Sequence, residues 1–157
     1  MAWSKVSEYM ASQMADLARY KSEPTEPFEW GSDLDCANDL QENMAELRKD
    51  DLLLVVQSCY RRLTTRHGTL VDAPDYGFSV KELIHAGLAP KDEARIAGQI
   101  QAELTKDDRL ETVEAAATFT DGAVAIEVSG MTRVGNFSMT MGVTAASASL
   151  LSYEVNQ

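Results

Sequence analysis

The side chains best suited to nucleophilic or metal chemistry are few in this chain. It contains two histidines, His67 and His85, and two cysteines, Cys36 and Cys59. A Cys59–His67 nucleophile pair is conceivable, because a neighbouring imidazole can activate a thiol. Cys59, however, falls on the apolar stripe of an expected helix, where a thiol is buried and inert. Neither histidine has a second His or Cys at metal-ligand spacing, so we expect no metal site and no cofactor.

Carboxylates are the other candidates, since two of them can act as the acid and base of a glycoside hydrolase. The possible members of such a pair are Asp72, Asp75, Glu103, Asp107 and Asp108. With 25 carboxylates in the chain, some pair at a suitable distance is expected by chance. The glycines near the C-terminus are scattered and form no phosphate-binding loop. We therefore expect no catalytic residues and no enzyme activity.

Charge and composition exclude several classes of partner. The 157 residues include 14 basic and 25 acidic side chains, a net charge of −11, whereas nucleic-acid binding requires a basic surface. The start of the chain lacks the basic and apolar regions of a signal peptide, and the longest strongly apolar run, residues 52–56, is too short to span a membrane. Two cysteines without CxxC spacing suit a reducing compartment. We expect no nucleic-acid and no membrane partner.

The N-terminal region is expected to be separate from the main domain. Apolar residues recur at steps of four, four and three, which predicts an amphipathic helix over residues 4–21. These residues are Val6, Met10, Met14 and Leu17. Prolines and a glycine follow in a linker, so we divide the chain into 1–32, a helix with a Pro-rich linker, and 33–157, a single domain. The helix either packs on its own domain or docks on a partner helix, and we favour docking.

Helices are expected through the middle of the chain. Apolar spacing, with acidic residues at the start and arginines at the end, predicts a helix over residues 50–65. Its buried stripe comprises Leu52, Val56, Cys59 and Leu63. Gly68 is placed to close this helix in a left-handed conformation. After the turn DAPDYG, a capping box of Ser79 and Glu82 predicts a short helix over residues 80–87.

Two further segments complete the helical part. Pro90 occupies a favoured first helical position, and the helix after it is expected to bury Ile96, Ile100 and Leu104. The segment 33–47 has weak helical spacing, and both a helix and an extended chain remain open for it.

The last third of the chain changes to alternating apolar residues, the spacing of strands. Asp121 and Gly122 form a two-residue turn that joins a hairpin. The expected register pairs Thr120 with Ala123, Phe119 with Val124, Ala117 with Ile126 and Ala115 with Val128. A third strand carries Phe137, Met139, Met141 and Val143, and a possible fourth carries Leu151, Tyr153 and Val155. The fold class is α+β, with N-terminal helices followed by a mostly antiparallel C-terminal sheet.

The edges of this sheet carry little protection. Residues 111–157 contain only six charged side chains, whereas soluble monomers usually guard sheet edges with charge or proline. Either the chain's own helices hide the edges, or a partner covers an edge or adds a strand to it. We favour the partner, because strand addition needs main-chain groups that are free to pair.

An ordered set of motifs over residues 50–113 resembles the baseplate wedge protein family of contractile tails. The set comprises RRLTTRHGTLVDAPDYGFSVKEL, the helix IAGQIQAEL and the run KDDRLETVEAA. The shared order is a helix ending in RL-T, a Gly-bearing turn, P-D-Y-G, a capped helix and a run into strands. The family includes sheath-initiator subunits of phages and the related subunits of pyocins, extracellular injection systems and type VI secretion baseplates. The resemblance does not choose among these four.

The resemblance implies a structural subunit that joins the baseplate wedge and starts sheath polymerisation through strand exchange at a sheet edge. Implied partners are other wedge subunits, the tail sheath protein and the tail tube or hub, with several copies in a hetero-oligomer. The implied place is the virion tail baseplate, assembled in the host cytoplasm, or a cytoplasmic contractile injection apparatus. Two alternatives stay open: a tail-associated peptidoglycan-cleaving enzyme and a soluble assembly chaperone.

The resemblance also points to a contact residue. Many members carry Glu-Pro-Arg before the first long strand, where this chain has Asp107-Asp108-Arg109. The arginine is kept and the proline is lost, so Arg109, with Asp107, is expected at a wedge contact. The full set of expected partner-binding residues is Arg109, Asp107, Val6, Met10, Met14, Leu17, Leu151, Tyr153 and Val155.

Overall fold

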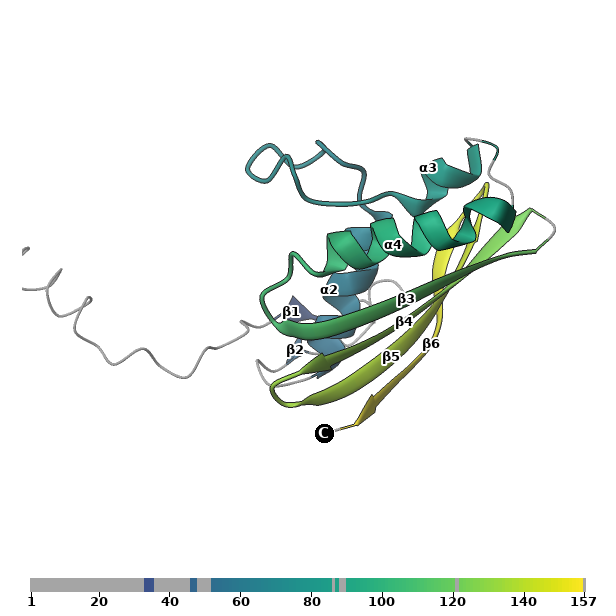
Figure 1. Cartoon of the computed structure of the whole chain (residues 1–157). Coiled ribbons are helices and arrows are strands. Elements are labelled where there is room, and N and C mark those ends of the chain that lie inside the picture. Colours follow the sequence, from purple (N-terminus) through teal and green to yellow (C-terminus); the bar gives the residue numbers. More distant parts are fainter. Residues whose placement is uncertain are drawn as a thin grey trace, which may run out of the picture.

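The computed structural model describes residues 33–35, 46–47, 52–85, 87, 90–120 and 122–156. The expected N-terminal helix, with Val6, Met10, Met14 and Leu17, lies outside these residues. Within the described ranges the helices are α2 (Leu52–Thr64), α3 (Val80–His85), the 3₁₀ turn η1 (Pro90–Asp92) and α4 (Glu93–Leu104). The strands are β1 (Asp33–Leu34), β2 (Glu46–Leu47), β3 (Leu110–Thr120), β4 (Ala123–Thr132), β5 (Gly135–Thr144) and β6 (Ala148–Asn156). Helices followed by a C-terminal antiparallel sheet confirm the expected α+β class (Figure 1).

The four long strands form one sheet in chain order, β3-β4-β5-β6, with every neighbouring pair antiparallel. The hairpin register is confirmed at all four expected pairs, Thr120–Ala123, Phe119–Val124, Ala117–Ile126 and Ala115–Val128. Gly122 in the turn has a φ of 83°, which suits a glycine. Because side chains alternate along a strand, this register places the apolar residues on one face.

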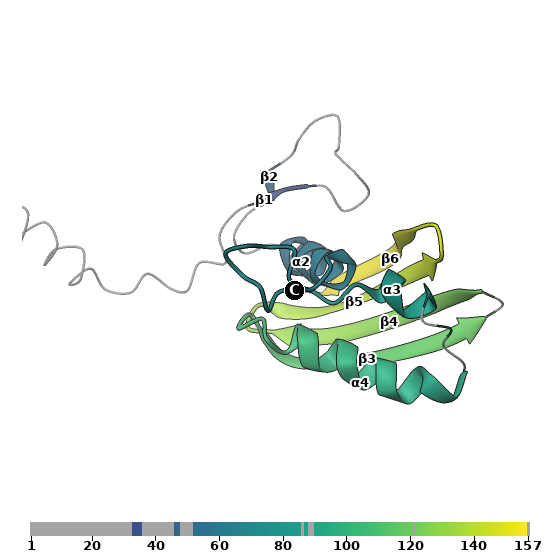
Figure 2. The same cartoon turned by 90° about the horizontal axis from the view of Figure 1, so that it is seen from above.

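The helices cover that apolar face of the sheet (Figure 2). Helix α4 contributes Ile96, Ile100 and Leu104, which are fully buried as expected. Helix α2 contributes Val56, Cys59 and Leu63. The sheet supplies buried residues from every strand: Val113, Ala117, Val124, Ile126, Val128, Phe137, Met139, Met141, Val143 and Leu150. The core is therefore one layer between the helices and the sheet.

Helix α2 is buried over more of its surface than one stripe. Leu54, Val55 and Gln57 are buried in addition to the expected residues. The Gln57 amide donates hydrogen bonds to the Leu34 carbonyl oxygen at 2.8 Å and to Asp33 at 3.1 Å. The segment 33–47, for which both a helix and an extended chain were open, is therefore extended where it is described, in β1 and β2. Strand β1 lies against α2 at Gln57.

Three local expectations need correction or refinement. Gly68 has the expected left-handed φ of 76°, but α2 ends at Thr64, so this glycine belongs to the following loop. Its amide donates to the Pro74 carbonyl oxygen at 3.0 Å. The Glu82 side chain forms an ion pair with Arg66 at 2.9 Å, and the Glu82 amide donates to the Ser79 carbonyl oxygen at 3.1 Å. Pro90 starts the turn η1, and α4 begins after it.

Strand β6 exists, but its side chains are divided differently from the expected alternation. An irregularity interrupts the pairing, because Leu150 lies opposite Met141 while Ser152 lies opposite Thr140. The extra residue is Leu151, as in a β-bulge. Leu151 contacts Gly142 on the outer face, whereas Tyr153 pairs with Met139 on the helix side. Leu151, Tyr153 and Val155 therefore do not share one face.

Candidate partner-binding site

The two edges of the sheet differ in how well they are covered. Helix α4 runs beside β3, and the Glu93 carboxylate accepts a hydrogen bond from the Phe119 amide at 2.9 Å (Figure 1). The Glu93 carboxylate therefore occupies the Phe119 amide, a main-chain donor that a strand added beside β3 would need. On the far side of β6, no described residue forms a strand pair. The chain's own helix α4 therefore lies along the β3 edge, whereas no described residue pairs with the outer edge of β6.

The β6 strand has an anchored half and an exposed half. In the anchored half, Leu150 is buried and the Tyr60 hydroxyl donates to the Ala148 carbonyl oxygen at 3.0 Å. The Lys81 ammonium holds the preceding turn through the Ala146 carbonyl oxygen at 2.9 Å. Residues 151–156, beyond the bulge, are all exposed. The bulge at Leu151 thus marks the boundary between the two halves.

The exposed half carries the three expected partner-binding residues of the C-terminus. Their exposed fractions are 64% for Leu151, 40% for Tyr153 and 37% for Val155. Because the bulge separates them, Leu151 is offered on the outer face and the other two on the helix side. A partner strand at this edge would find apolar side chains on both faces. Alternate side chains of this kind set the register of an added strand.

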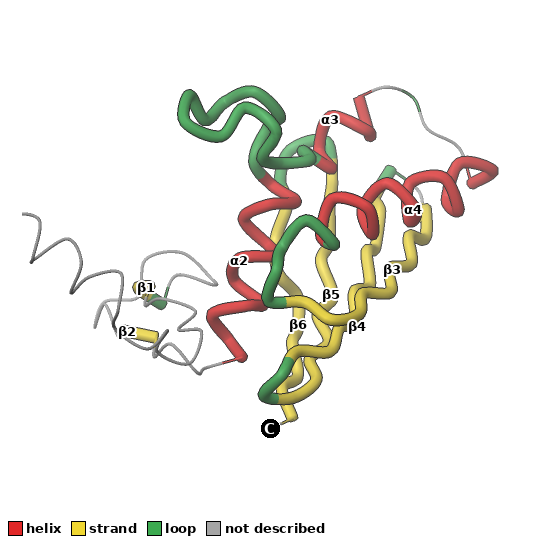
Figure 3. The backbone as a smooth tube through the Cα atoms, turned by 60° about the vertical axis from the view of Figure 1, so that its left-hand side comes forward, coloured by secondary structure: helices red, strands yellow, loops and turns green. Residues whose placement is uncertain are grey.

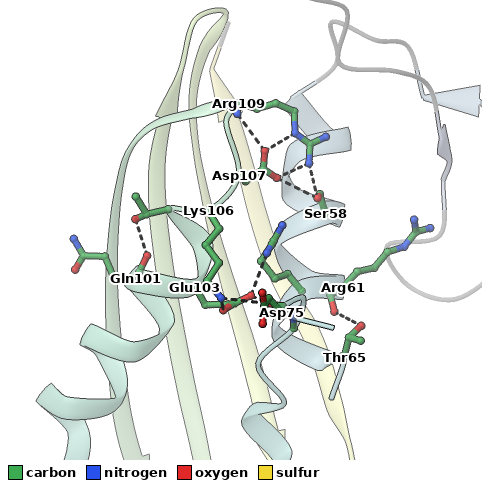
Figure 4. A network of polar contacts seen from close by, with 12 residues as sticks. Ser58, Arg61, Thr65, Asp75, Gln101, Glu103, Lys106, Asp107 and Arg109 are labelled. Atoms are coloured by element: carbon green, nitrogen blue, oxygen red, sulfur yellow. Dashed lines mark hydrogen bonds and ion pairs between the residues drawn. The ribbon is translucent and has the colours of Figure 1, made fainter. Parts of the chain in front are cut away.

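Asp107 and Arg109 form an ion pair at the start of β3 (Figure 4). The Arg109 Nε donates to Asp107 Oδ1 at 2.8 Å, and Nη2 donates to Oδ2 at 2.5 Å. Arg109 Nη2 also lies 2.5 Å from the Ser58 hydroxyl on α2. The Asp107 side chain is 8% exposed and the Arg109 side chain is 17% exposed. This pair therefore connects the α4–β3 turn to α2 inside the subunit.

Asp107 and Arg109 shift each other's pKa toward the charged form. Burial alone would raise the pKa of Asp107, but the hydrogen bonds and charge of Arg109 outweigh it and hold that pKa below its ordinary value. The same bonds raise the pKa of Arg109. Arg109 uses Nε and Nη2 within the subunit, so Nη1 is the nitrogen through which it could also contact a partner.

Sequence reasoning missed a second buried charge cluster, centred on Glu103 of α4 (Figure 4). Glu103 accepts hydrogen bonds from Arg62 Nη1 at 3.1 Å, from the Gly77 amide at 3.1 Å and from Lys106 Nζ at 2.6 Å. Glu103 lies three residues after buried Ile100, so helical spacing alone already placed it on the buried face. That spacing was the available signal.

The Glu103 carboxylate has the wrong electrostatics for a general acid. Burial raises its pKa, yet the hydrogen bonds from Lys106 and Arg62 prevail and lower it. A glycosidase acid needs a raised pKa. Of the other candidate carboxylates, Asp72, Asp75 and Asp108 are exposed, and Asp107 is paired with Arg109. Glu103 is thus placed as an anchor between elements.

The remaining reactive side chains do not converge in the described ranges. Cys59 is 1% exposed, and burial raises the pKa of its thiol to about 12, which leaves it protonated and unreactive. His67 is exposed on the loop after α2. Among the described residues, no three His, Cys, Asp or Glu side chains come together as metal ligands.

Comparison with known proteins adds no family to this picture. No protein-family model matches the chain, and neither does any curated protein. No helix in the described part of the chain has the length and apolar character needed to span a membrane.

Proposed function

We propose that this chain is a structural subunit of a contractile-tail baseplate. It joins the wedge and initiates sheath polymerisation by offering the β6 edge to a strand of the sheath protein. In this role the chain catalyses no reaction, and its binding partners are other protein subunits. Its motifs over residues 50–113 resemble the wedge family, and its C-terminal sheet has the form that strand addition uses.

The observation that carries the proposal is the exposed half of β6. A strand edge with which no other described strand pairs is a template for pairing with another chain, and β6 carries one charged side chain, Glu154. Residues 151–156 combine such an edge with exposed Leu151, Tyr153 and Val155. A strand from the sheath protein would satisfy the main-chain groups and cover these side chains. The anchored residues before the bulge would keep the acceptor strand in place.

The experiment removes the exposed half and leaves the anchored half intact. Chains that end at Leu150 are assembled with the wedge and sheath subunits of the same tail, and particles are viewed by electron microscopy. We expect baseplates that form normally and carry no sheath. Normal sheath on these baseplates would overturn the role of β6.

A point variant tests the same edge without shortening the chain. Tyr153→Lys adds a charge to the β6 edge, and charges there oppose strand addition. Thr118→Lys is the matched control, since Thr118 is an exposed residue of the opposite edge strand β3. We expect sheath to be lost only with Tyr153→Lys, at unchanged thermal stability. Equal sheath yields from the two variants would contradict strand exchange at β6.

A particle-composition experiment separates this function from an assembly chaperone. A structural subunit stays in the finished particle, whereas a chaperone leaves it. Mass spectrometry of purified particles should detect the chain at a fixed ratio to the wedge subunits. Its absence from complete particles would exclude the structural role.

A further inference from the structure

The loop between α2 and α3 projects from the molecule at the end opposite to the C-terminal end of β6 (Figure 3). It spans residues 65–79, and its tip carries two exposed apolar side chains. Val71 is 94% exposed and Leu70 is 43% exposed. Single exposed apolar residues are common, but here two consecutive ones stand on a projecting loop, and we call these two residues the apolar knob.

The loop is held in one conformation by its own main chain. The Thr69 amide donates to the Arg66 carbonyl oxygen at 3.1 Å, and the Ala73 amide donates to the Leu70 carbonyl oxygen at 3.3 Å. A third bond, from the Gly68 amide to the Pro74 carbonyl oxygen at 3.0 Å, closes the tip. The apolar knob is therefore preorganised, which reduces the entropy lost on binding.

The base of the loop is fixed by buried charge. The Glu103 carboxylate accepts from the Gly77 amide, and Lys106 Nζ donates to the Asp75 carbonyl oxygen at 3.2 Å. The Arg62 guanidinium lies 4.3 Å from the centroid of the Tyr76 ring. Buried ion pairs are a poor source of net stability, because desolvation offsets their attraction. Here the charged cluster sets the position of a loop that is otherwise exposed.

The charges near the knob are acidic. Asp72 follows Val71 directly, and Asp75 lies on the returning side of the loop, both exposed. The nearby cations Arg66 and Lys106 are already paired, with Glu82 and Glu103 respectively. A partner that receives the two apolar side chains therefore meets carboxylates around them. Complementary charge calls for lysine or arginine at the rim of its pocket.

We propose that the loop of residues 66–75 is a second partner-binding surface, in which Leu70 and Val71 enter an apolar pocket with a basic rim on another wedge subunit. This inference rests on the proposed function for the identity of the partner. It assigns the two activities of the subunit to different surfaces. The β6 edge receives the sheath, and the loop tip binds the wedge.

The test uses the full chain, a wedge subunit and the sheath subunit of the same tail, with binding measured separately for each. Val71→Asp places a charge inside the apolar pocket and should weaken wedge binding about tenfold or more. Val71→Ile keeps the apolar knob, and Val134→Asp makes the same charge change at another exposed valine, in the β4–β5 turn. Both controls should bind the wedge within about threefold of the unaltered chain.

Salt dependence tests the basic rim. Wedge binding by the unaltered chain should weaken as salt rises, and Asp72→Asn with Asp75→Asn should reduce that dependence. A salt dependence that these changes leave untouched would overturn the basic rim.

The outcomes distinguish the two proposals. If the unaltered chain binds no wedge subunit, the proposed function fails, and this inference fails with it. If the unaltered chain binds and Val71→Asp binds equally well, only the loop assignment is overturned. A Val71→Asp variant that loses sheath binding and keeps wedge binding would likewise overturn it.

Discussion

At the scale of single residues, the buried charges of this protein connect segments that are distant in sequence. Asp107 and Arg109 tie the start of β3 to Ser58 of α2. Glu103 ties α4 to Arg62 of α2 and to the loop at Gly77. Each cluster pairs its own charges, because an unpaired charge would be too costly to bury, but the buried Arg62 Nε has no hydrogen-bond partner among the described residues. Their first effect is therefore on the relative positions of elements.

Arg109→Ala should lower the free energy of unfolding by about 3 kcal/mol, because it leaves the buried Asp107 carboxylate without its partner. Thermal and urea unfolding measure the loss. Adding Asp107→Asn should recover part of it, since the remaining side chain carries no charge.

The double variant also tests the expected wedge contact. If Arg109 contributes directly to the wedge, the folded double variant should still bind the wedge more weakly than Asp107→Asn alone. Equal wedge binding by these two variants would restrict Arg109 to its role within the subunit.

The stability of the protein should fall in acid because of Glu103. The folded state lowers the pKa of this carboxyl, so the unfolded chain binds the proton more readily, and stability is lost as pH falls through the ordinary value of 4.5. Asp107, with its lowered pKa, adds to the loss from its ordinary value of 3.8 downward. Unfolding in urea at a series of pH values measures the slope.

Glu103→Gln should flatten this acid dependence and destabilise the protein by about 3–5 kcal/mol at neutral pH, because it removes the charge that Arg62 faces in a buried site. Glu82→Gln is the control, since its pair with Arg66 is exposed and worth about 1 kcal/mol or less. An unchanged acid slope in Glu103→Gln would show that other carboxyls cause the loss.

At the scale of elements, the α2–α3 loop depends on a close contact between its two sides. Gly77 has a φ of 101°, and a Cβ added there would lie 2.6 Å from the Thr65 carbonyl oxygen. The Phe78 amide donates to the Arg62 carbonyl oxygen at 2.8 Å next to this contact. Only glycine fits, because both the backbone conformation and the space exclude a side chain.

Gly77→Ala should therefore destabilise the protein by about 2 kcal/mol or more, through strain and the clash with Thr65. Gly68→Ala is the matched comparison, since its φ of 76° is also left-handed but nothing lies within 4 Å of the added Cβ. Its cost should be about 1 kcal/mol. Thermal unfolding of both variants compares them, and equal costs would contradict the close contact.

Strand β6 illustrates the same scale at the other end of the molecule. Its first residue, Ala148, is bonded to Tyr60 of α2, and Lys81 of α3 holds the turn before it, while residues 151–156 pair only with β5 among the described residues. A bulge separates the two parts, and bulges often redirect side chains near sheet edges. One strand can therefore belong to the subunit at its start and be offered to a partner at its end.

At the scale of the whole molecule, one layer of helices on one sheet leaves two kinds of surface exposed. The β6 edge lies on one side, and the loop between α2 and α3 projects on another (Figures 1 and 3). A subunit that joins a wedge to a growing sheath needs two such separate surfaces. The proposed wedge contact and the proposed sheath contact can then be occupied at the same time.

The amino-acid sequence by itself determined the local structure. Period-two spacing around Asp121 and Gly122 set the β3–β4 register, and the spacing of Ile96, Ile100 and Leu104 set the buried face of α4. These features depend on neighbours within a few residues, so a pattern in the chain contains them. The resemblance to wedge proteins used the same local order of turns and helices.

Only the tertiary structure decided which edge is covered, where β6 bulges and which charges meet. Glu93 reaches Phe119, and Glu103 reaches Gly77, across more than twenty residues of sequence. Such contacts depend on how helices pack against the sheet, and 25 interchangeable carboxylates give no local signal for which ones pair. The sequence had already predicted a partner surface at Leu151, Tyr153 and Val155, and the tertiary structure adds that α4 lies beside β3, at the opposite edge of the sheet.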